Sequence, residues 1–333
     1  LDSYREARAR GWSDEEFVRL VRDLDAAVAR VHGHGFVRTP LIDAPPLASA
    51  LGLDPGRLWL KDDTGNVAGS HKARHLFGVL LHLAVSDTRG ELAIASCGNA
   101  ALAAAVVAKA AGRPLKVFIP TWADPNVTAA LDALDADIVV CARRADETGD
   151  PTYLRFSEAV SAGAVPFSCQ GTMTATTLDG GRTLGWELAD QLAERGVSGR
   201  VRLYVQVGGG ALASAVWSGL GEGVRDSEGN GSIEPVMHPV QTSACAPLAR
   251  AWSRLCEAAS DPVERMPLAR AHPERFMWAW EEVGRSAASG ILDDVTYDWL
   301  HIAAAMNASG GWPVTVSEAE VVETHGLVRV HTS

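Results

Sequence analysis

Lys72 is the residue whose position most clearly suggests covalent chemistry. It stands between two histidines in GNVAGSHKARHL, residues 65–76, behind a Gly-Ser step and at the start of an apolar, helix-like run. A cation is unfavourable in the first turn of a helix, so this placement favours a neutral amine, the form that attacks a carbonyl group. Lys72 is therefore either a lysine that bonds to a cofactor or an ordinary solvated lysine, and this segment alone favours the solvated one.

A run of three glycines, Gly208 to Gly210, follows an apolar strand and opens a helix in VGGGALASA, residues 207–215. Glycine lets backbone N–H groups approach an anion, and a helix N-terminus favours negative charge. The run is either a phosphate-binding turn or a tight turn without a ligand. It does not fit the dinucleotide fingerprint, because the third glycine position is Ala213, and it lacks the Lys-Ser/Thr of a P-loop.

A second strand–turn–helix segment is SCGNAALAA, residues 96–104. Asn99 is either the cap of the helix or a group that hydrogen-bonds a ligand hydroxyl. Ser96 and the N–H groups of the turn have the chemistry to hold a carboxylate. We interpret Cys97 as a small buried side chain, because no histidine or asparagine partner for a nucleophile is evident in the sequence.

Composition excludes several classes of function. The chain has 333 residues and a formal net charge of −11, and no stretch concentrates Lys and Arg, so we expect no binding to nucleic acid or to an anionic membrane. The five cysteines are scattered without a C-x-x-C pair, which suggests neither a disulfide framework nor a zinc site. No segment resembles a transmembrane helix or a signal peptide, so we expect a cytoplasmic protein. We also expect no bound metal.

The elements that must position these segments alternate along the chain. The pattern predicts strands at 57–63, 91–97, 115–120, 137–142, 202–207 and 234–241, and helices at 13–31, 70–84, 99–112, 125–136, 151–163, 181–196, 211–220, 246–259 and from 317. The helices at 13 and 317 begin with capping boxes, Ser13 with Glu16 and Ser317 with Glu320. Several strands are continuous apolar runs, which is typical of a parallel sheet covered on both faces, so the predicted class is α/β.

The order of three motifs resembles the fold type II pyridoxal-phosphate enzymes, which include threonine synthase, threonine and serine dehydratases, cysteine synthase and the tryptophan synthase β-subunit. The motifs are K-D-D-x-G-N-x-x-G-S-H-K at 61–72, S-C-G-N-A-A at 96–101 and V-G-G-G-A-L at 207–212. Weaker similarities lie at 39–52, 179–188, 285–291 and 314–333, so the resemblance covers residues 39–333.

The resemblance implies pyridoxal 5'-phosphate as cofactor and assigns a role to each matching residue. Lys72 would form the Schiff base, Asn99 would bond the ring hydroxyl, His71 would lie beside the ring, and Ser333 or Thr332 would face the pyridine nitrogen. The cofactor phosphate would be held by Gly208, Gly209, Gly210, Ala211 and Leu212. The substrate carboxylate site would be lined by Ser70, Ser96, Cys97, Gly98 and Ala100.

The resemblance also implies a lyase or synthase that acts at Cβ or Cγ of a small amino acid, with Lys72 removing the α-proton. We expect the threonine dehydratase and threonine synthase side of the family, with β-replacement like that of cysteine synthase or tryptophan synthase β as an alternative. Threonine synthase activity would need cations for a phosphorylated substrate, for which Lys61 and Arg74 are candidates. Alternatives of other classes are a nicotinamide-dependent oxidoreductase and a non-catalytic binding protein of the same fold.

The expected domains also follow from the resemblance. Residues 80–172 would form a smaller, mobile α/β domain with the substrate carboxylate loop, and residues 1–79 with 173–333 a larger one with Lys72 and the glycine loop. The family likeness further implies a homodimer. We expect His75, a second imidazole near Lys72, to pack inside its helix without acid–base work.

Overall fold

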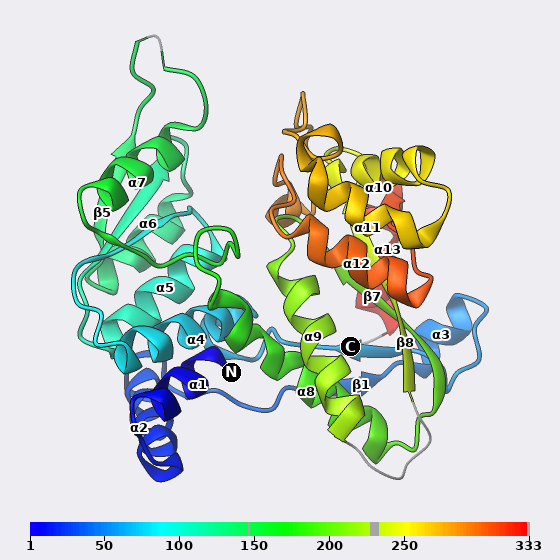
Figure 1. The fold of residues 1–333 in the computed structure, drawn as a ribbon, viewed down its shortest axis with the longest axis horizontal. Coiled ribbons are helices and arrows are strands. Elements are labelled where there is room, and N and C mark those ends of the chain that lie inside the picture. The colour runs from blue at the N-terminus through cyan, green and yellow to red at the C-terminus, as the bar shows by residue number, and fades with distance from the viewer. Residues whose placement is uncertain (146, 227–232, 332–333) are drawn as a thin grey trace. The chain divides into compact units, whose positions relative to one another are not determined.

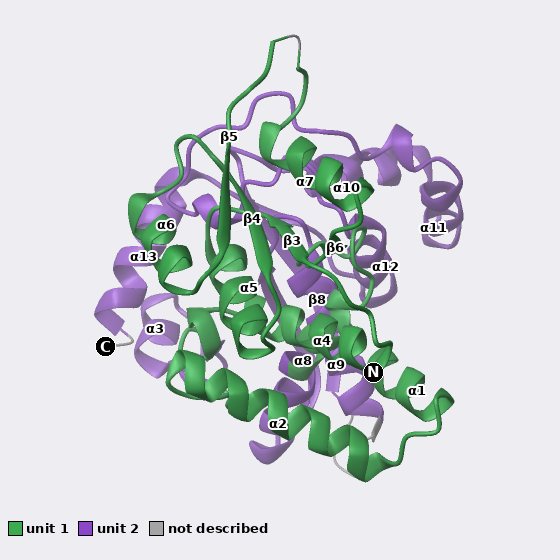
Figure 2. Ribbon diagram, turned by 90° about the vertical axis from the view of Figure 1, so that its left-hand side faces the viewer, with its two compact units in different colours: residues 1–39, 63–183 green, residues 40–62, 184–333 purple. Residues whose placement is uncertain are grey.

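The computed structural model describes residues 1–145, 147–226 and 233–331. Figure 1 gives the order of the elements along the chain. The chain forms two compact units, which Figure 2 colours separately: unit 1 comprises residues 1–39 and 63–183, and unit 2 comprises residues 40–62 and 184–333. No helix in the described part of the chain is long and apolar enough to cross a membrane.

Unit 1 is built on a four-stranded parallel sheet. The strands lie in the order β5 (Asp137–Cys141), β4 (Leu115–Pro120), β3 (Leu92–Ala95) and β6 (Val165–Pro166). Four helices alternate with them along the chain: α4 (Lys72–Val85), α5 (Asn99–Ala110), α6 (Pro125–Ala133) and α7 (Pro151–Ser161). The main core joins the buried side chains of α4 and α5 to those of β3 and β4. Strands buried in this way read as apolar runs, as the sequence indicated.

The N-terminal helices of unit 1 are α1 (Asp2–Ala9) and α2 (Asp14–His32). The capping box of α2 is confirmed, because Ser13 and Glu16 exchange side-chain and backbone hydrogen bonds. A short 3₁₀ turn, η1 (Val67–Gly69), precedes α4. Helix α8 (Thr177–Glu194) begins in unit 1 and continues into unit 2.

Unit 2 contains two small sheets. Strands β1 (Leu41–Asp43) and β2 (Trp59–Lys61) are antiparallel, and α3 (Pro45–Ala50) lies between them in the chain. Strands β7 (Gly199–Gln206), β8 (Ile233–Thr242) and β9 (Val314–Val316) form a parallel sheet. The helices are α9 (Ala211–Asp226), α10 (Pro247–Ala258), α11 (Pro262–Ala271), α12 (Trp299–Ser309) and α13 (Glu318–His331), with 3₁₀ turns η2 (Pro273–Arg275) and η3 (Ser289–Ile291). The largest core cluster of this unit includes β7, α10 and α12.

The α/β class and the parallel sheets are confirmed, while several element predictions were wrong. The strand predicted at 57–63 is limited to Trp59–Lys61 and is antiparallel to β1. The helix predicted at 181–196 begins four residues earlier, at Thr177, and its first turn includes Gly180, which packs against the backbone of α4. Helix α12 is apolar almost throughout and shows no amphipathic period.

The two compact units divide the chain at other positions than the boundaries expected at residues 80 and 172. The packing places Lys72 in the same unit as Asn99. The expected mobile domain is a statement about motion, and it stays a prediction.

Candidate active site

The start of α4 carries Lys72. The 3₁₀ turn before it takes positive φ at Ala68 and Gly69, 55° and 68°, and this sharp turn brings Ser70 and His71 to the helix start. Ser70 is buried, and its hydroxyl has no hydrogen-bond partner among the described residues. Lys72 is half-buried, and its amine forms no hydrogen bond or ion pair with another described residue. The sequence motif thus places an uncommitted hydroxyl and an uncommitted amine two positions apart in the chain.

Two imidazoles flank this amine, and both are held neutral. Burial lowers the pKa of His75 to about 4. Its Nδ1 lies 2.7 Å from the carbonyl oxygen of Thr177, so this nitrogen donates and the buried Nε2 keeps a lone pair without a partner. Burial also lowers the pKa of His71 well below its ordinary value, and the charge of Lys72 lowers it further. The two rings meet edge to face with centroids 5.6 Å apart.

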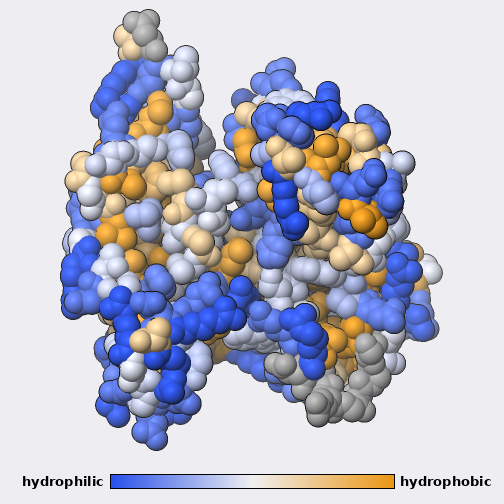
Figure 3. Space-filling model, viewed as in Figure 1, coloured by the Kyte–Doolittle hydropathy of each residue, from blue (hydrophilic) through white to orange (hydrophobic). Residues whose placement is uncertain are grey.

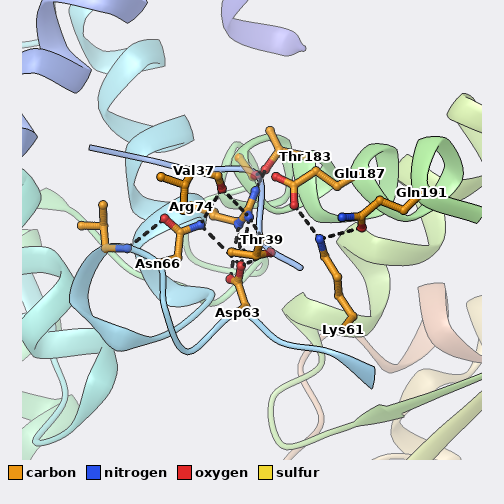
Figure 4. Close-up of polar contacts among 11 residues, drawn as sticks. Val37, Thr39, Lys61, Asp63, Asn66, Arg74, Thr183, Glu187 and Gln191 are labelled. Carbon is orange, nitrogen blue, oxygen red and sulfur yellow. Dashed lines mark hydrogen bonds and ion pairs between the residues drawn. The ribbon is translucent and has the colours of Figure 1, made fainter. Parts of the chain in front are cut away.

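Arg74 fixes the first turn of α4 through a buried polar network (Figure 4). Its Nη2 lies 2.9 Å from Oδ1 of Asp63, and its Nε lies 3.1 and 3.2 Å from the two carboxylate oxygens. Its Nη1 donates to the hydroxyl of Thr183 at 2.9 Å, and Nη2 also donates to Thr39 at 3.2 Å. Asn66 donates to the same carboxylate at 3.4 Å. Because Arg74 is two residues after Lys72, this network restrains the backbone that carries the amine.

Two glycines allow the start of α8 to pack closely against α4. A Cβ on Gly180 would overlap the carbonyl group of Arg74, and a Cβ on Gly78 would lie 2.5 Å from the backbone nitrogen of Gly180. Both contacts involve backbone atoms, which cannot rotate away. The position of α4 in unit 1 therefore depends on the absence of side chains at these two positions.

The turn between β3 and α5 supplies a second part of the candidate site in unit 1. Gly98 is the N-cap, and Asn99 is the first helical residue, with an exposed side chain. The alternative that Asn99 caps the helix is therefore not realised, and its amide is available to a ligand. Ser96 accepts a hydrogen bond from the N–H group of Gly98 at 3.4 Å. Burial raises the pKa of the Cys97 thiol, which keeps it protonated.

The glycine turn in unit 2 forms a backbone cradle at the N-terminus of α9. The N–H groups of residues 208–212 donate no hydrogen bond to other described residues, whereas Val207 still donates to Val240 in the sheet. A Cβ on Gly208 would overlap the carboxylate of Asp293. Gly210 has φ of +104°, and a Cβ there would lie 2.9 Å from Cδ1 of Ile302. Unsatisfied N–H groups at a helix N-terminus form an anion site.

The structure groups the predicted site residues by unit. Unit 1 holds Ser70, His71, Lys72, Ser96, Cys97, Gly98, Asn99 and Ala100, and unit 2 holds Gly208, Gly209, Gly210, Ala211 and Leu212. Thr332 and Ser333 lie outside the described residues. Sequence reasoning missed Asp63 and Thr183, the partners of Arg74. The only signal was the Asp pair of the KDD stretch, which motif spacing alone does not connect to Arg74.

Lys61 is engaged in a similar way within unit 2 (Figure 4). Its amine lies 2.7 Å from a carboxylate oxygen of Glu187 and 2.9 Å from the side-chain oxygen of Gln191. Both cations suggested for a substrate phosphate, Lys61 and Arg74, thus already have carboxylate partners.

Comparison with known proteins gives consistent matches. The family model described as "Pyridoxal-phosphate dependent enzyme" matches residues 34–325. Threonine synthase of Synechocystis sp. is 27% identical over 297 residues, 87% of this chain and 65% of that protein. L-threonine ammonia-lyase of Thermotoga maritima is 28% identical over 180 residues, 54% of this chain and 41% of that protein. The chain thus spans less than two thirds of the length of these two relatives.

Solved structures show the same fold. The processed form of threonine deaminase isoform 2 from Solanum lycopersicum has a TM-score of 0.68 at 17% identity, covering 96% of this chain and 79% of that one. The threonine deaminase of T.th. has a TM-score of 0.68 at 22% identity, covering 93% of this chain and 86% of that one. At these identities the likeness concerns the fold.

Proposed function

Because the chain belongs to the family of pyridoxal-phosphate-dependent enzymes, we propose that it is a lyase that removes a leaving group from Cβ of a small amino acid and yields a 2-oxo acid and ammonia. The observation that carries this proposal is the uncommitted amine of Lys72 at the start of a buried helix. Replacement at Cβ or Cγ, as in a synthase, is the second candidate, favoured by the likeness to the Synechocystis threonine synthase.

The residues present fit the cofactor. The cradle of residues 208–212 offers unpartnered N–H groups of the kind that bind a phosphate, and its glycines leave no room for side chains. Lys72 supplies the amine that bonds to an aldehyde, and the exposed amide of Asn99 suits a ring hydroxyl. When bound, pyridoxal phosphate supplies the electron sink that stabilises negative charge at the substrate Cα. The role of Thr332 or Ser333 at the pyridine nitrogen stays a prediction.

The chain's own residues supply binding and proton transfer. The turn from Ser96 to Ala100 leads into the N-terminus of α5, which favours the substrate carboxylate. Lys72 removes the proton from Cα and then delivers a proton to the leaving group. The Cα–H and Cβ–leaving group bonds break, a C=C bond forms, and the leaving group departs with its electron pair. The released enamine becomes an imine, and water hydrolyses it to the 2-oxo acid and ammonia.

The two imidazoles do not carry protons in this scheme. Burial keeps the pKa of His75 at about 4, so it stays neutral at the pH where amines react. His71 is neutral for the same reason. Their place is to exclude water and charge from the vicinity of Lys72.

The partners of Lys61 and Arg74 bear on the choice between elimination and replacement with a phosphorylated substrate. Glu187 with Gln191 and Asp63 with Thr183 already satisfy these two cations. An anionic substrate would therefore need a different cation of this chain. Lys61 and Arg74 are therefore not the groups that would hold a phosphorylated substrate in this scheme.

The test is product formation by the protein loaded with pyridoxal phosphate. A panel of small amino acids, including L-serine and L-threonine, is incubated with the wild type and with Lys72→Ala, and 2-oxo acid and ammonia are measured. Equal amounts of both products from the wild type, and neither from Lys72→Ala, are expected. Products at the same rate from Lys72→Ala would refute the role of Lys72. A wild type that binds the cofactor but turns over no amino acid would support the non-catalytic alternative.

Assembly and location are part of the proposal. We propose a cytoplasmic homodimer that does not bind nucleic acid. The net charge of −11 supports the absence of nucleic-acid binding. The five cysteines without disulfide bonds support the location, and the family likeness supports the dimer. Light scattering in solution should give twice the chain mass of 35.2 kDa. A mass of one chain at micromolar concentration would contradict the dimer.

A further inference from the structure

A surface cavity of about 550 Å³ lies within unit 1 at the carboxyl ends of three parallel strands. Its lining comes from the turns that follow β3, β4 and β5 and from the start of α7. Figure 2 shows these three strands side by side with α7 nearby. Ligands of open α/β sheets bind at this edge. The volume falls within the range of about 300–1,000 Å³ that is typical of small-molecule sites.

The cavity begins at the turn proposed to hold the substrate carboxylate. Ser96 and Cys97 belong both to that turn and to the cavity lining. A substrate whose carboxylate is bound by this turn lies next to the cavity. Its side chain is attached to the same Cα as the carboxylate, so the group on Cβ is the part that can enter the cavity. The hydroxyl of serine is about the size of one water, roughly 30 Å³. The cavity therefore has room for a much larger group than the leaving group of serine or threonine.

One cation in the lining is not neutralised. Arg143 donates from Nη1 to the carbonyl oxygen of Glu147 at 2.9 Å, and it forms no ion pair within the described part of the chain. Its neighbours differ, because Arg144 and Arg155 each lie 3.0 Å from a carboxylate oxygen of Glu158. The guanidinium of Arg143 thus keeps most of its donors for a ligand.

The other polar groups of the lining are mainly donors. Ser96 and Thr121 contribute hydroxyls. The acidic residue of the lining, Asp150, is the cap of α7. Its Oδ1 accepts from the N–H group of Thr152 at 3.0 Å and also from the Thr152 hydroxyl. Because Asp150 is committed to the start of α7, the free donors of Arg143 and the two hydroxyls are the groups that favour an anionic ligand.

We propose that this cavity binds an anionic group, a phosphate or carboxylate, carried beyond Cβ by the amino-acid substrate, with Arg143 as its charged contact. The inference rests on the proposed function for the place of the substrate carboxylate. It identifies the substrate class as amino acids with an acidic side-chain group, and it supplies the cation that Lys61 and Arg74 do not. Hydrophobic residues reach the surface over β5 and α7 (Figure 3), and Trp122, 77% exposed, also lines the cavity.

The experiment compares O-phospho-L-serine with L-serine as probes of the cofactor-loaded protein. Rapid mixing measures the dissociation constant from the shift of the visible cofactor band before turnover. The wild type should bind O-phospho-L-serine at least about tenfold more tightly, the size expected for a hydrogen bond to a charged group. Arg143→Gln should remove this preference and leave the affinity for L-serine unchanged. Arg143→Lys should restore part of it.

Arg144→Gln is the matched control, because Arg144 is a neighbouring, exposed arginine that is already paired with Glu158. It should keep the preference. L-Serine with added inorganic phosphate separates an anion on the substrate from a free one, and tighter L-serine binding with phosphate would overturn the proposal. So would a preference that survives in Arg143→Gln, or tighter binding of the cationic probe L-2,3-diaminopropionate.

Failure of the proposed function gives a different signature. A wild type without any visible cofactor band would refute the cofactor role and leave the cavity to be tested by thermal melting. An increase in melting temperature with O-phospho-L-serine that Arg143→Gln abolishes and Arg144→Gln retains would still support an anion site. An equal increase in all three proteins would overturn it.

Discussion

Removal of the Asp63 carboxylate tests whether the Arg74 network holds the first turn of α4. The side chains of Arg74 and Asp63 are only 4% and 11% exposed, so Asp63→Ala leaves a guanidinium buried without its counter-charge. Breaking a buried pair from one side costs about 3–5 kcal/mol. The remaining acceptors, Thr183, Thr39 and the carbonyl of Val37, are neutral and cannot replace the charge. The expected loss is a large part of a total stability of about 5–15 kcal/mol.

Equilibrium urea denaturation measures this loss, and hydrogen exchange of peptides from residues 72–85 locates it. Asp63→Ala should lower the free energy of unfolding by about 3 kcal/mol or more and speed exchange in α4. The double variant Asp63→Ala/Arg74→Met, which removes both charges, should regain at least about 1 kcal/mol. Arg5→Ala, which breaks a pair whose arginine side chain is 78% exposed, should cost less than about 1 kcal/mol.

Two results would refute this reasoning. One is an unchanged urea midpoint for Asp63→Ala. The other is a double variant that loses the sum of the two single losses, because that would show that the two charges do not depend on each other.

Three further predictions concern positions where the structure allows little freedom. Gly210→Ala, at φ of +104° and with Ile302 close by, should weaken cofactor binding at least about tenfold in a fluorescence titration, and unchanged affinity would contradict the cradle. Gly180→Ala should lower the free energy of unfolding, measured by urea denaturation, by roughly 1–3 kcal/mol. Gly221→Ala, at a position that faces open space, should leave it unchanged. Burial lowers the pKa of His75 to about 4, from about 6.5 in the unfolded chain, so the unfolded state binds more protons in this window. Protonation of His75 should therefore lower the free energy of unfolding by about 3 kcal/mol as the pH falls from about 6.5 to about 4. His75→Asn should lose less stability on acidification than the wild type, and equal slopes would count against the assignment.

Local features were the part of the fold that the sequence could predict. The capping boxes at Ser13 and Ser317 are both present, because each needs hydrogen bonds across only three residues. The strand–turn–helix order at Lys72, Asn99 and Gly208 is also confirmed, since glycine and apolar periodicity determine it locally.

Long-range packing decided what the sequence could not show. Arg74 bonds to Thr183, which is 109 positions away, and no spacing rule connects them. The close approach of Gly180 in α8 to the backbone of α4 is a contact that neither segment reveals alone. Likewise, Asn99 was a candidate cap by type, but the backbone of Gly98 takes that position. The proposed anion cavity joins four segments from 95 to 152, of which only the first carried a motif.

The most direct measurement of the central claim is reductive trapping of the cofactor. The protein is loaded with pyridoxal phosphate, reduced with borohydride, digested and mapped by mass spectrometry. The account predicts one stable cofactor adduct on the peptide that contains Lys72, and none on Lys72→Ala treated in the same way. An adduct on a different lysine, or no adduct on the wild type, would contradict the assignment of Lys72 as the residue that binds the cofactor.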